Sequence, residues 1–300
     1  MISKLKVSER KLWGYLFISP FIIYFLVFLM YPIFLSIQNS FLSINLLEPE
    51  KAKFVGFENW LNALTDQLFW KSIFNIFYNQ LIFIVVSFIV ALFLALLLNE
   101  IEKGGSFFRT IYFMPVITSI TVSMVIFQFL MSPTGPLQAM LLNSQMITEP
   151  IYWTFTKWLP MPVIAFFSVW KWFGVSMIIY LGGLASIDKR LYEAAQLDGA
   201  NWFQRVFKIS IPLLKPQIMF VTTMNVINGL QMFTESYMNF DLLGGRYNSA
   251  LTPVLYLYGK GFDQMKMGEA SSIGLLLAGL IFAMTMGQMK LFNKGEEDAS

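Results

Sequence analysis

Six long apolar stretches limit the folds that this chain can adopt. They cover about residues 12–37, 71–98, 108–131, 163–186, 217–237 and 270–291. A helix of about twenty apolar residues is long enough to cross the hydrocarbon core of a bilayer. Only 13% of the residues are charged, against about 25% in soluble domains. The sequence therefore predicts an all-α polytopic membrane protein, with six transmembrane helices in a single domain over residues 1–300.

The positions of the basic residues predict how the chain is oriented. Six spans place both termini on one side. Most of the 21 lysines and arginines lie in four segments that would share this side: the N-terminus, the turn after the second span, the stretch 188–216 and the tail. Basic residues in short loops favour the cytoplasmic side, so both termini and the 188–216 stretch are predicted to be cytoplasmic. The net charge of +3 is small, and no nucleic-acid partner is expected.

Two residue types that support much of enzyme chemistry are absent. The chain contains no cysteine and no histidine. It therefore lacks disulfides, thiolate nucleophiles, the commonest general base and the commonest metal ligand. We predict no catalytic residue and no metal site. An enzyme would need paired carboxylates in one pocket, and the sequence shows no such pair.

The stretch 188–216 is a charged, amphipathic segment between two apolar spans. A first helix is expected over 189–198, with Leu191, Ala194 and Ala195 on one face. Gly199 ends this helix, because glycine adopts the left-handed conformation at little steric cost. Asn201, followed by Gln204, is a good N-cap for a second helix. Pro212 and Pro216 are expected to stop that helix. The result is a helix-turn-helix, and from periodicity alone an amphipathic helix lying on lipid remains an alternative.

The same stretch resembles a known motif. Glu193-Ala194-Ala195, then Gly199, then Ile209-Ser210-Ile211-Pro212 are similar to the EAA loop of binding-protein-dependent ABC importer permeases. That pattern is E-A-A, three residues, G, nine residues and I-x-L-P, and only Ile211 departs from it. The longer match over 192–200 resembles the carbohydrate subgroup, which includes maltose-type and glycerol-phosphate-type first permeases. Asp188 and Arg246 depart from the subgroup, which usually has proline at both places.

The resemblance implies a fold, partners and a location. It implies the ABC importer permease fold, with 188–216 as the loop that couples to a separate ATPase. The coupling residues would be Glu193, Ala194, Ala195, Gly199, Ile209, Ile211 and Pro212. The implied partners are a second permease subunit, forming a heterodimer, two ABC ATPase subunits, an extracellular or periplasmic solute-binding protein, the sugar and membrane lipid. The implied location is the bacterial or archaeal cytoplasmic membrane. The chain has no G-x-x-x-x-G-K-[ST] motif, so ATP and Mg are expected on the partner ATPase and no cofactor in this chain.

Polar residues within the spans suggest a substrate pathway. In the fifth span Asn225, Asn228, Gln231 and Glu235 fall within an arc of about 120° on a helix. Amides and a carboxylate suit sugar hydroxyls, although Asn and Gln also form hydrogen bonds between helices. In the fourth span Trp172, Ser176 and Tyr180 share a face. Trp170 and Trp172 are candidates for stacking on sugar rings, and core or interface packing is the alternative.

Three further polar residues lie in the second and fourth spans. Lys171 has three possible roles: its ammonium reaches the outer interface, pairs with an acid, or meets an anionic substrate. The sequence does not decide among them. Asn75 and Asn79, one helical turn apart, are expected to be helix-packing groups.

The predicted function is a permease subunit of an ATP-driven ABC importer for sugars or oligosaccharides, which forms half of the translocation pathway. One alternative is an ion-coupled secondary sugar transporter. That class needs an intramembrane acid or cation site, for which Glu235 is the one candidate. Another alternative is an ABC permease for glycerol-phosphate-like or polyol substrates.

Overall fold

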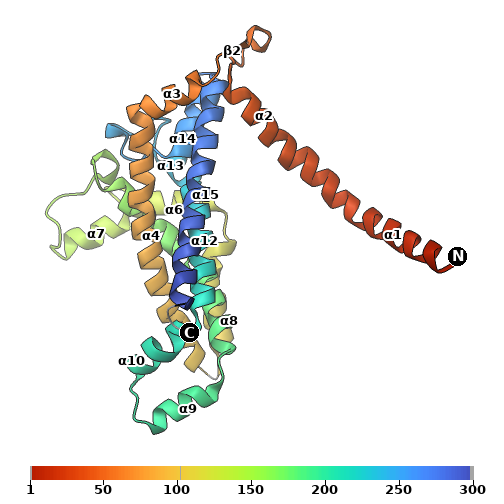
Figure 1. Cartoon of the computed structure of the whole chain (residues 1–300). Coiled ribbons are helices and arrows are strands. Elements are labelled where there is room, and N and C mark those ends of the chain that lie inside the picture. Colours follow the sequence, from red (N-terminus) through yellow and green to blue (C-terminus); the bar gives the residue numbers. More distant parts are fainter. Residues whose placement is uncertain (1, 102, 298–300) are drawn as a thin grey trace. The chain divides into compact units, whose positions relative to one another are not determined.

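The computed structural model describes residues 2–101 and 103–297, and the side chains of residues 12–101 and 103–292. Helices make up most of the described chain, which confirms the predicted all-α class (Figure 1). The two strands that it contains, β1 (Leu42–Ser43) and β2 (Lys53–Phe54), form one short antiparallel pair with Leu42 opposite Phe54. The basic residues Lys4, Lys6, Arg10, Lys11 and Lys294, which contribute to the predicted orientation, lie outside the described side chains.

Internal contacts divide the chain into two compact units, where the sequence predicts one domain. The first unit covers residues up to 66 and 257–276, and the second covers 67–256 and residues from 277 onward. Helices α14 (Pro253–Tyr258) and α15 (Met267–Glu297) contribute residues to both ranges.

The first unit contains the N-terminal span and a small polar assembly. Its elements are α1 (Ile2–Tyr24), the π-helix η1 (Phe25–Met30), α2 (Tyr31–Ser40), η2 (Pro49–Lys51), α3 (Glu58–Thr65), η6 (Gly259–Asp263) and the start of α15. Asn59 organises this assembly, since its Nδ2 donates to the carbonyl oxygens of Ser40 (2.9 Å) and Leu42 (3.0 Å). The Lys260 ammonium bridges Asp66 at 3.6 Å and Glu269 at 2.9 Å.

The second unit is built on two long helices, α4 and α8. Its elements are α4 (Gln67–Glu100), α5 (Gly105–Ile117), α6 (Ile120–Met131), α7 (Pro136–Asn143), η3 (Trp153–Phe155), α8 (Pro160–Ala185), α9 (Lys189–Leu197), α10 (Trp202–Arg205), η4 (Val206–Ser210), α11 (Ile211–Leu213), α12 (Lys215–Leu230), α13 (Thr234–Asn239) and η5 (Arg246–Asn248). Helices α4 and α8 run parallel. Asn79 Nδ2 donates to the Met161 carbonyl at 2.9 Å near their starts, and Leu96 and Leu184 share a core cluster near their ends.

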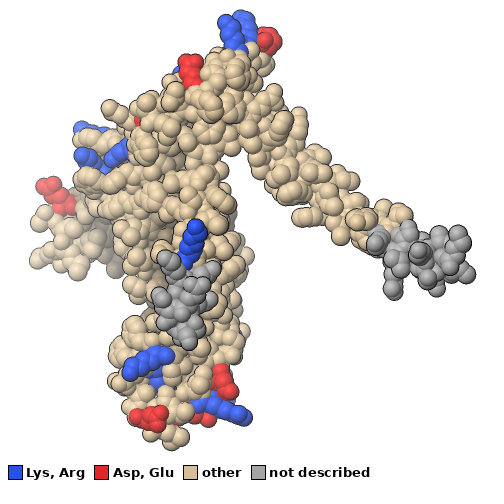
Figure 2. Space-filling view, in the orientation of Figure 1, with Lys and Arg blue, Asp and Glu red and all other residues tan. Residues whose placement is uncertain are grey.

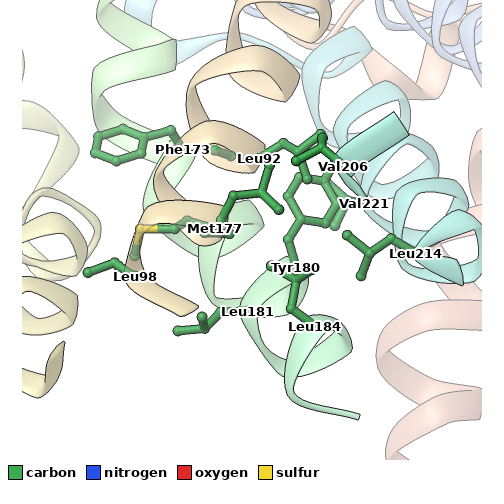
Figure 3. Packing of buried hydrophobic residues seen from close by; sticks show 13 residues of the cluster. Leu92, Leu98, Phe173, Met177, Tyr180, Leu181, Leu184, Val206, Leu214 and Val221 are labelled. Carbon is green, nitrogen blue, oxygen red and sulfur yellow. The ribbon is translucent and has the colours of Figure 1, made fainter. Parts of the chain in front are cut away.

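Small residues let α4 and α8 approach closely. Ala91 and Ala95 of α4 are fully buried within the cluster that also holds Met177 and Tyr180 of α8. Side chains from the segment that follows α8, among them Val206, Leu214 and Val221, complete this core (Figure 3). On the visible face of the second unit, most charged side chains lie towards its two ends, and the stretch between them is mostly tan (Figure 2). This distribution is the one that a membrane-spanning unit requires.

Five segments of the described residues are long and apolar enough to cross a membrane. They are Leu12–Ser40, Gln67–Glu100, Ile120–Asn143, Pro160–Ala185 and Met267–Phe292. The prediction of one continuous third helix over 108–131 is wrong. Helix α5 ends at Ile117, Thr118 and Ser119 are extended, and α6 begins at Ile120. Pro115 lies in the last turn of α5, close to this break.

Candidate functional site

A cavity of about 580 Å³ lies among α4, α8, α12 and α13. Its polar lining side chains come from Gln80, Ser168, Ser176, Asn225, Asn228, Gln231, Thr234 and Glu235, and its aromatic ones from Phe83, Trp172, Phe220 and Phe233. Amides, hydroxyls, one carboxylate and aromatic faces therefore surround one space. Such a lining can exchange hydrogen bonds with a hydroxylated ligand and stack on its apolar faces.

The predicted polar stripe of the fifth span lines this cavity, but it lies on two helices and the break between them, and not on one helix. Helix α12 ends at Leu230 and α13 begins at Thr234, so the continuous helix predicted over 217–237 is wrong. All four predicted residues nevertheless line the cavity, with Asn225 and Asn228 on α12, Gln231 in the break and Glu235 on α13. The break leaves backbone groups without helical partners, and the Thr252 hydroxyl donates to the Met232 carbonyl at 2.9 Å.

The predicted face of the fourth span is only partly correct. Trp172 and Ser176 line the cavity. Tyr180, predicted beside them, lies in the core instead, among Leu92, Val206 and Val221 (Figure 3). Its ring meets that of Phe88 edge-on, with the centroids 6.1 Å apart. The 188–216 segment folds back against α8 at this level, and it covers the face that helical spacing alone would leave open. Trp170 packs on Phe167, with centroids 6.0 Å apart, and is not among the lining residues.

Gln80 of α4 is a lining residue that the sequence interpretation missed. Its Nε2 donates to Asn79 Oδ1 at 3.3 Å, and its buried Oε1 has no partner among the described residues. Gly229 of α12 leaves room for this amide, since a methyl group there would contact it. The available signal was a glutamine within an apolar run. Asn79, which donates to Met161 of α8, is a helix-packing group as predicted. The prediction is wrong for Asn75, which donates to the carbonyls of Asn248 (2.8 Å) and Leu251 (3.0 Å) in and after the η5 turn.

Glu235 is the one ionisable side chain among those that line the cavity, and it is 7% exposed. Lys171 is next to Trp172 in sequence, and its ammonium lies 5.5 Å from the centre of the Trp172 ring, but Lys171 is not among the lining residues. Its ammonium donates to the carbonyl oxygens of Pro115 and Thr118, both at 2.5 Å, and to the Thr118 hydroxyl at 3.0 Å. None of the three predicted roles describes it. With only 1% of its surface exposed, Lys171 supplies the donors that the end of α5 lacks at the helix break.

The first half of the 188–216 segment folds as predicted. Asp188 caps α9 by accepting from the Arg190 N–H at 2.9 Å, which gives the unexpected aspartate a local role. Gly199 has a φ of +77°. The Ala200 N–H donates to the Ala195 carbonyl at 2.9 Å, and the Gly199 N–H donates to the Gln196 carbonyl at 3.0 Å. These two bonds form a Schellman motif, which ends the helix in a sharp turn.

The second half contains the predicted capping box. Asn201 Oδ1 accepts from the Gln204 N–H at 2.9 Å, and Gln204 Oε1 accepts from the Asn201 N–H at 2.8 Å. The prediction that Pro212 and Pro216 stop this helix is wrong. The chain passes through one π-helical turn, η4, and continues into α11 and α12 with each proline near a helix start. The wider π-helical turn lets the helix continue although Pro212 has no N–H to donate.

One side-chain contact joins the two halves of this segment, and another joins the segment to α4. The Tyr192 and Ser210 hydroxyls are 2.9 Å apart, and Trp202 Nε1 donates to Glu100 Oε1 at the end of α4 at 2.9 Å. Of the predicted coupling residues, Glu193, Ala194, Gly199 and Pro212 are exposed, whereas Ala195, Ile209 and Ile211 are half-buried. Leu191, Phe203, Phe207 and Leu213 are also exposed, and Leu197 is 90% exposed. The segment is thus a braced projection with an apolar surface.

Comparisons with known proteins agree with these features. The family described as binding-protein-dependent transport system inner membrane component matches residues 88–295. The arabinooligosaccharides transport system permease protein of Halalkalibacterium halodurans is 33% identical over 97% of this chain and 92% of its own length. The lactose transport system permease protein of Rhizobium radiobacter is 34% identical over 84% of both chains. The trehalose/maltose transport system permease protein of Thermococcus litoralis is 31% identical over 97% of both.

A solved structure has the same fold. It is a chain of a bacterial ABC transporter involved in the import of the acidic polysaccharide alginate, with a TM-score of 0.82 at 23% identity. The match covers 97% of this chain and 99% of the other. The agreement of fold, sequence and motif leads to one assignment. The chain belongs to the family of binding-protein-dependent transport system inner membrane components, the multi-pass permeases of ABC importers.

Proposed function

We propose that this chain is one of two permease subunits of an ATP-driven importer for sugars or oligosaccharides. The cavity among α4, α8, α12 and α13 would form its half of the translocation pathway. The observation that carries this proposal is the convergence of Asn225, Asn228, Gln231 and Trp172 on one space of about 580 Å³. A cavity of this size accommodates a ligand of one or a few sugar rings.

The substrate class is supported by the chemistry of the cavity and by the relatives. Amides and hydroxyls both donate and accept hydrogen bonds, as sugar hydroxyls do. The Trp172 indole offers an apolar face to a pyranose ring. Permeases named for arabinooligosaccharides, lactose, and trehalose or maltose share about a third of their residues with this chain.

The charge of the cavity favours a neutral substrate over a glycerol-phosphate-like one. Glu235 is the one ionisable lining residue, and the ammonium of Lys171 is held by backbone carbonyls of α5. A phosphate in this cavity would meet a carboxylate and no cation from the lining residues. Phosphate recognition usually relies on Arg or Lys, so a neutral, hydroxyl-rich ligand is the better match.

The 188–216 segment would transmit the motion of a separate ATPase. Its exposed residues Glu193, Ala194 and Gly199 match the EAA motif, and small side chains permit close approach of a partner surface. The capping box, the Schellman turn and the contact of Trp202 with Glu100 stiffen the segment. A stiff element transfers force to α4 and α12 instead of absorbing it. ATP and Mg would be bound by the partner.

The remaining partners follow from the family. Its members depend on a binding protein, which would deliver the sugar from outside. A second permease subunit would complete the pathway, and two ATPase subunits would lie below. The chain would reside in the bacterial or archaeal cytoplasmic membrane with both termini in the cytoplasm.

Uptake by the complete importer tests the pathway. The double variant Asn228→Leu/Gln231→Leu removes two polar groups from the cavity, so uptake of labelled sugar should fall at least tenfold while the subunits still assemble. Thr222→Leu, on the same helix but outside the cavity, is the matched control. Unchanged uptake in the double variant would return both residues to a packing role. Uptake that survives ATP depletion but collapses with an uncoupler would favour an ion-coupled transporter that uses Glu235.

Co-purification tests the coupling segment. Glu193→Lys and Gly199→Val should release the ATPase from the purified complex, because one reverses a charge at the contact and the other strains a backbone with positive φ. Both variants should still insert in the membrane and keep their helical circular dichroism. Normal co-purification and normal uptake in both would contradict the coupling role.

A further inference from the structure

Two lysines converge on one tryptophan beside the starts of α4 and α8. The Lys71 ammonium lies 5.6 Å from the centroid of the Trp158 ring, and the Lys157 ammonium lies 5.1 Å from the same centroid. Phe74 completes the cluster. Its ring lies 5.6 Å from the Lys71 ammonium and meets Trp158 edge-on, with centroids 6.3 Å apart. Segments far apart in sequence thus hold two cations against the same aromatic surface.

The positive charge of this cluster is not neutralised. The two ammonium groups face the same Trp158 ring at 5.6 and 5.1 Å from its centre, so they repel each other. The ion pairs of the described residues use Lys51, Lys260 and Lys266, and none involves Lys71 or Lys157. Two long helices begin beside the cluster, and their N-terminal dipoles add further positive potential. Repelling cations held together in this way indicate that an anion binds there.

The position of the cluster identifies the kind of anion. Trp70, Phe74, Leu81 and Val85 form an exposed apolar stripe along α4, at helical spacing. Such a stripe on a spanning helix faces lipid chains, and aromatic and basic residues at its end lie at the level of the headgroups. Trp158 is 52% exposed at this end. A lipid whose acyl chain follows the stripe would bring its phosphate to the two ammonium groups.

We propose that Lys71, Lys157 and Trp158 bind the headgroup phosphate of an anionic phospholipid, with an acyl chain along the exposed stripe of α4. Free phosphate offers the same charge but gains nothing from the stripe. A basic residue near a membrane surface contributes about a fivefold preference for anionic lipid, so the pair should give roughly thirtyfold. The site is separate from the cavity, whose lining includes none of these residues.

Quenching by brominated lipids measures this preference directly. The full chain is reconstituted in phosphatidylcholine vesicles that contain increasing fractions of brominated phosphatidylglycerol or, in a parallel series, of brominated phosphatidylcholine. The difference in fluorescence between the wild type and Trp158→Phe isolates the signal of Trp158 from the other tryptophans. We expect half-maximal quenching of Trp158 at a roughly thirtyfold lower fraction of the anionic lipid than of the neutral one.

Matched variants separate the site from general charge effects. Lys71→Gln/Lys157→Gln should abolish the preference, and Lys71→Arg/Lys157→Arg should keep it. Lys51→Gln/Lys53→Gln changes the net charge equally at exposed residues elsewhere and should also keep it. Equal quenching by both lipids in the wild type, or a preference that survives the double Gln change, would overturn the proposal. Equal quenching by both lipids would indicate instead that the cluster binds an acidic protein surface. Loss of the preference in excess inorganic phosphate would assign the site to a free anion and would equally overturn it.

Discussion

The contact between α5 and α8 depends on the absence of a side chain at Gly174. A methyl group there would lie 2.5 Å from the Tyr112 carbonyl oxygen and 3.3 Å from the Phe113 Cα. Both are backbone atoms of α5, so neither can move without moving that helix. Gly182, two turns further along α8, has no atom within 4 Å of the same hypothetical methyl group. The two glycines therefore form a natural pair for one substitution, Gly→Ala.

The expected magnitudes follow from two opposing effects. In a helix interior, Gly→Ala gains about 0.8–1 kcal/mol because alanine loses less backbone entropy on folding. At Gly182 this gain is the whole effect, so Gly182→Ala should be stabilised by just under 1 kcal/mol. At Gly174, forcing a methyl group into a filled site costs about 1–3 kcal/mol. Gly174→Ala should therefore range from neutral to destabilised by about 2 kcal/mol, and the two variants should differ by about 1–3 kcal/mol.

Denaturation of the purified chain by SDS, from a mild detergent, measures these free energies. Gly174→Ala should also loosen the break after α5, because Pro115 and Thr118 lie on the side of α5 that Lys171 contacts. Amide hydrogen exchange at residues 119–121 should then accelerate in Gly174→Ala and stay unchanged in Gly182→Ala. Equal unfolding free energies for the two variants would refute the reasoning, because the close approach would then cost nothing.

Three other substitutions have defined outcomes. Lys171→Met removes the donor of two part-buried carbonyls, so it should lower the unfolding free energy by about 1–2 kcal/mol, whereas Lys208→Met, at an exposed residue, should change little. Asn201→Ala removes the capping box and should cost about 1 kcal/mol, seen as faster hydrogen exchange over 202–205, and Asn201→Asp should retain most protection. Trp172→Leu should lower sugar uptake, while Tyr180→Phe should not, because only Trp172 lines the cavity; equal effects would contradict the assigned positions.

The local features of the 188–216 segment were predictable because their causes are local. Gly199 ends a helix through its own backbone freedom, and Asn201 caps the next one through a residue three positions away. The prolines misled the sequence interpretation. A proline within a helical pattern usually ends the helix, but here a π-turn accommodates Pro212 and the helix continues. Only the packing of Val206 and Leu214 against α8 fixes that path.

The cavity also combines features that the sequence predicts with features that only the tertiary structure shows. The helical spacing of Asn225 and Asn228 predicts a polar face, and the structure places both on the cavity. The spacing of Trp172, Ser176 and Tyr180 also predicts one face, but the chain that returns after α8 covers Tyr180. Gln80 lines the cavity from α4, so no residue spacing within a single span could have related it to α12. A helical pattern tells which residues share a side, but not what lies opposite them.

By itself, the sequence determined the helical class, the long apolar segments, the capped turn at Gly199 and the family motif, because hydrophobicity, backbone freedom and capping act over a few residues. The tertiary structure decided where the helices break and which polar groups meet. The break after Ile117 persists because Lys171 supplies donors from α8, and the break after Leu230 is bridged by Thr252. A buried backbone group needs a partner, and in both places that partner comes from a distant part of the chain.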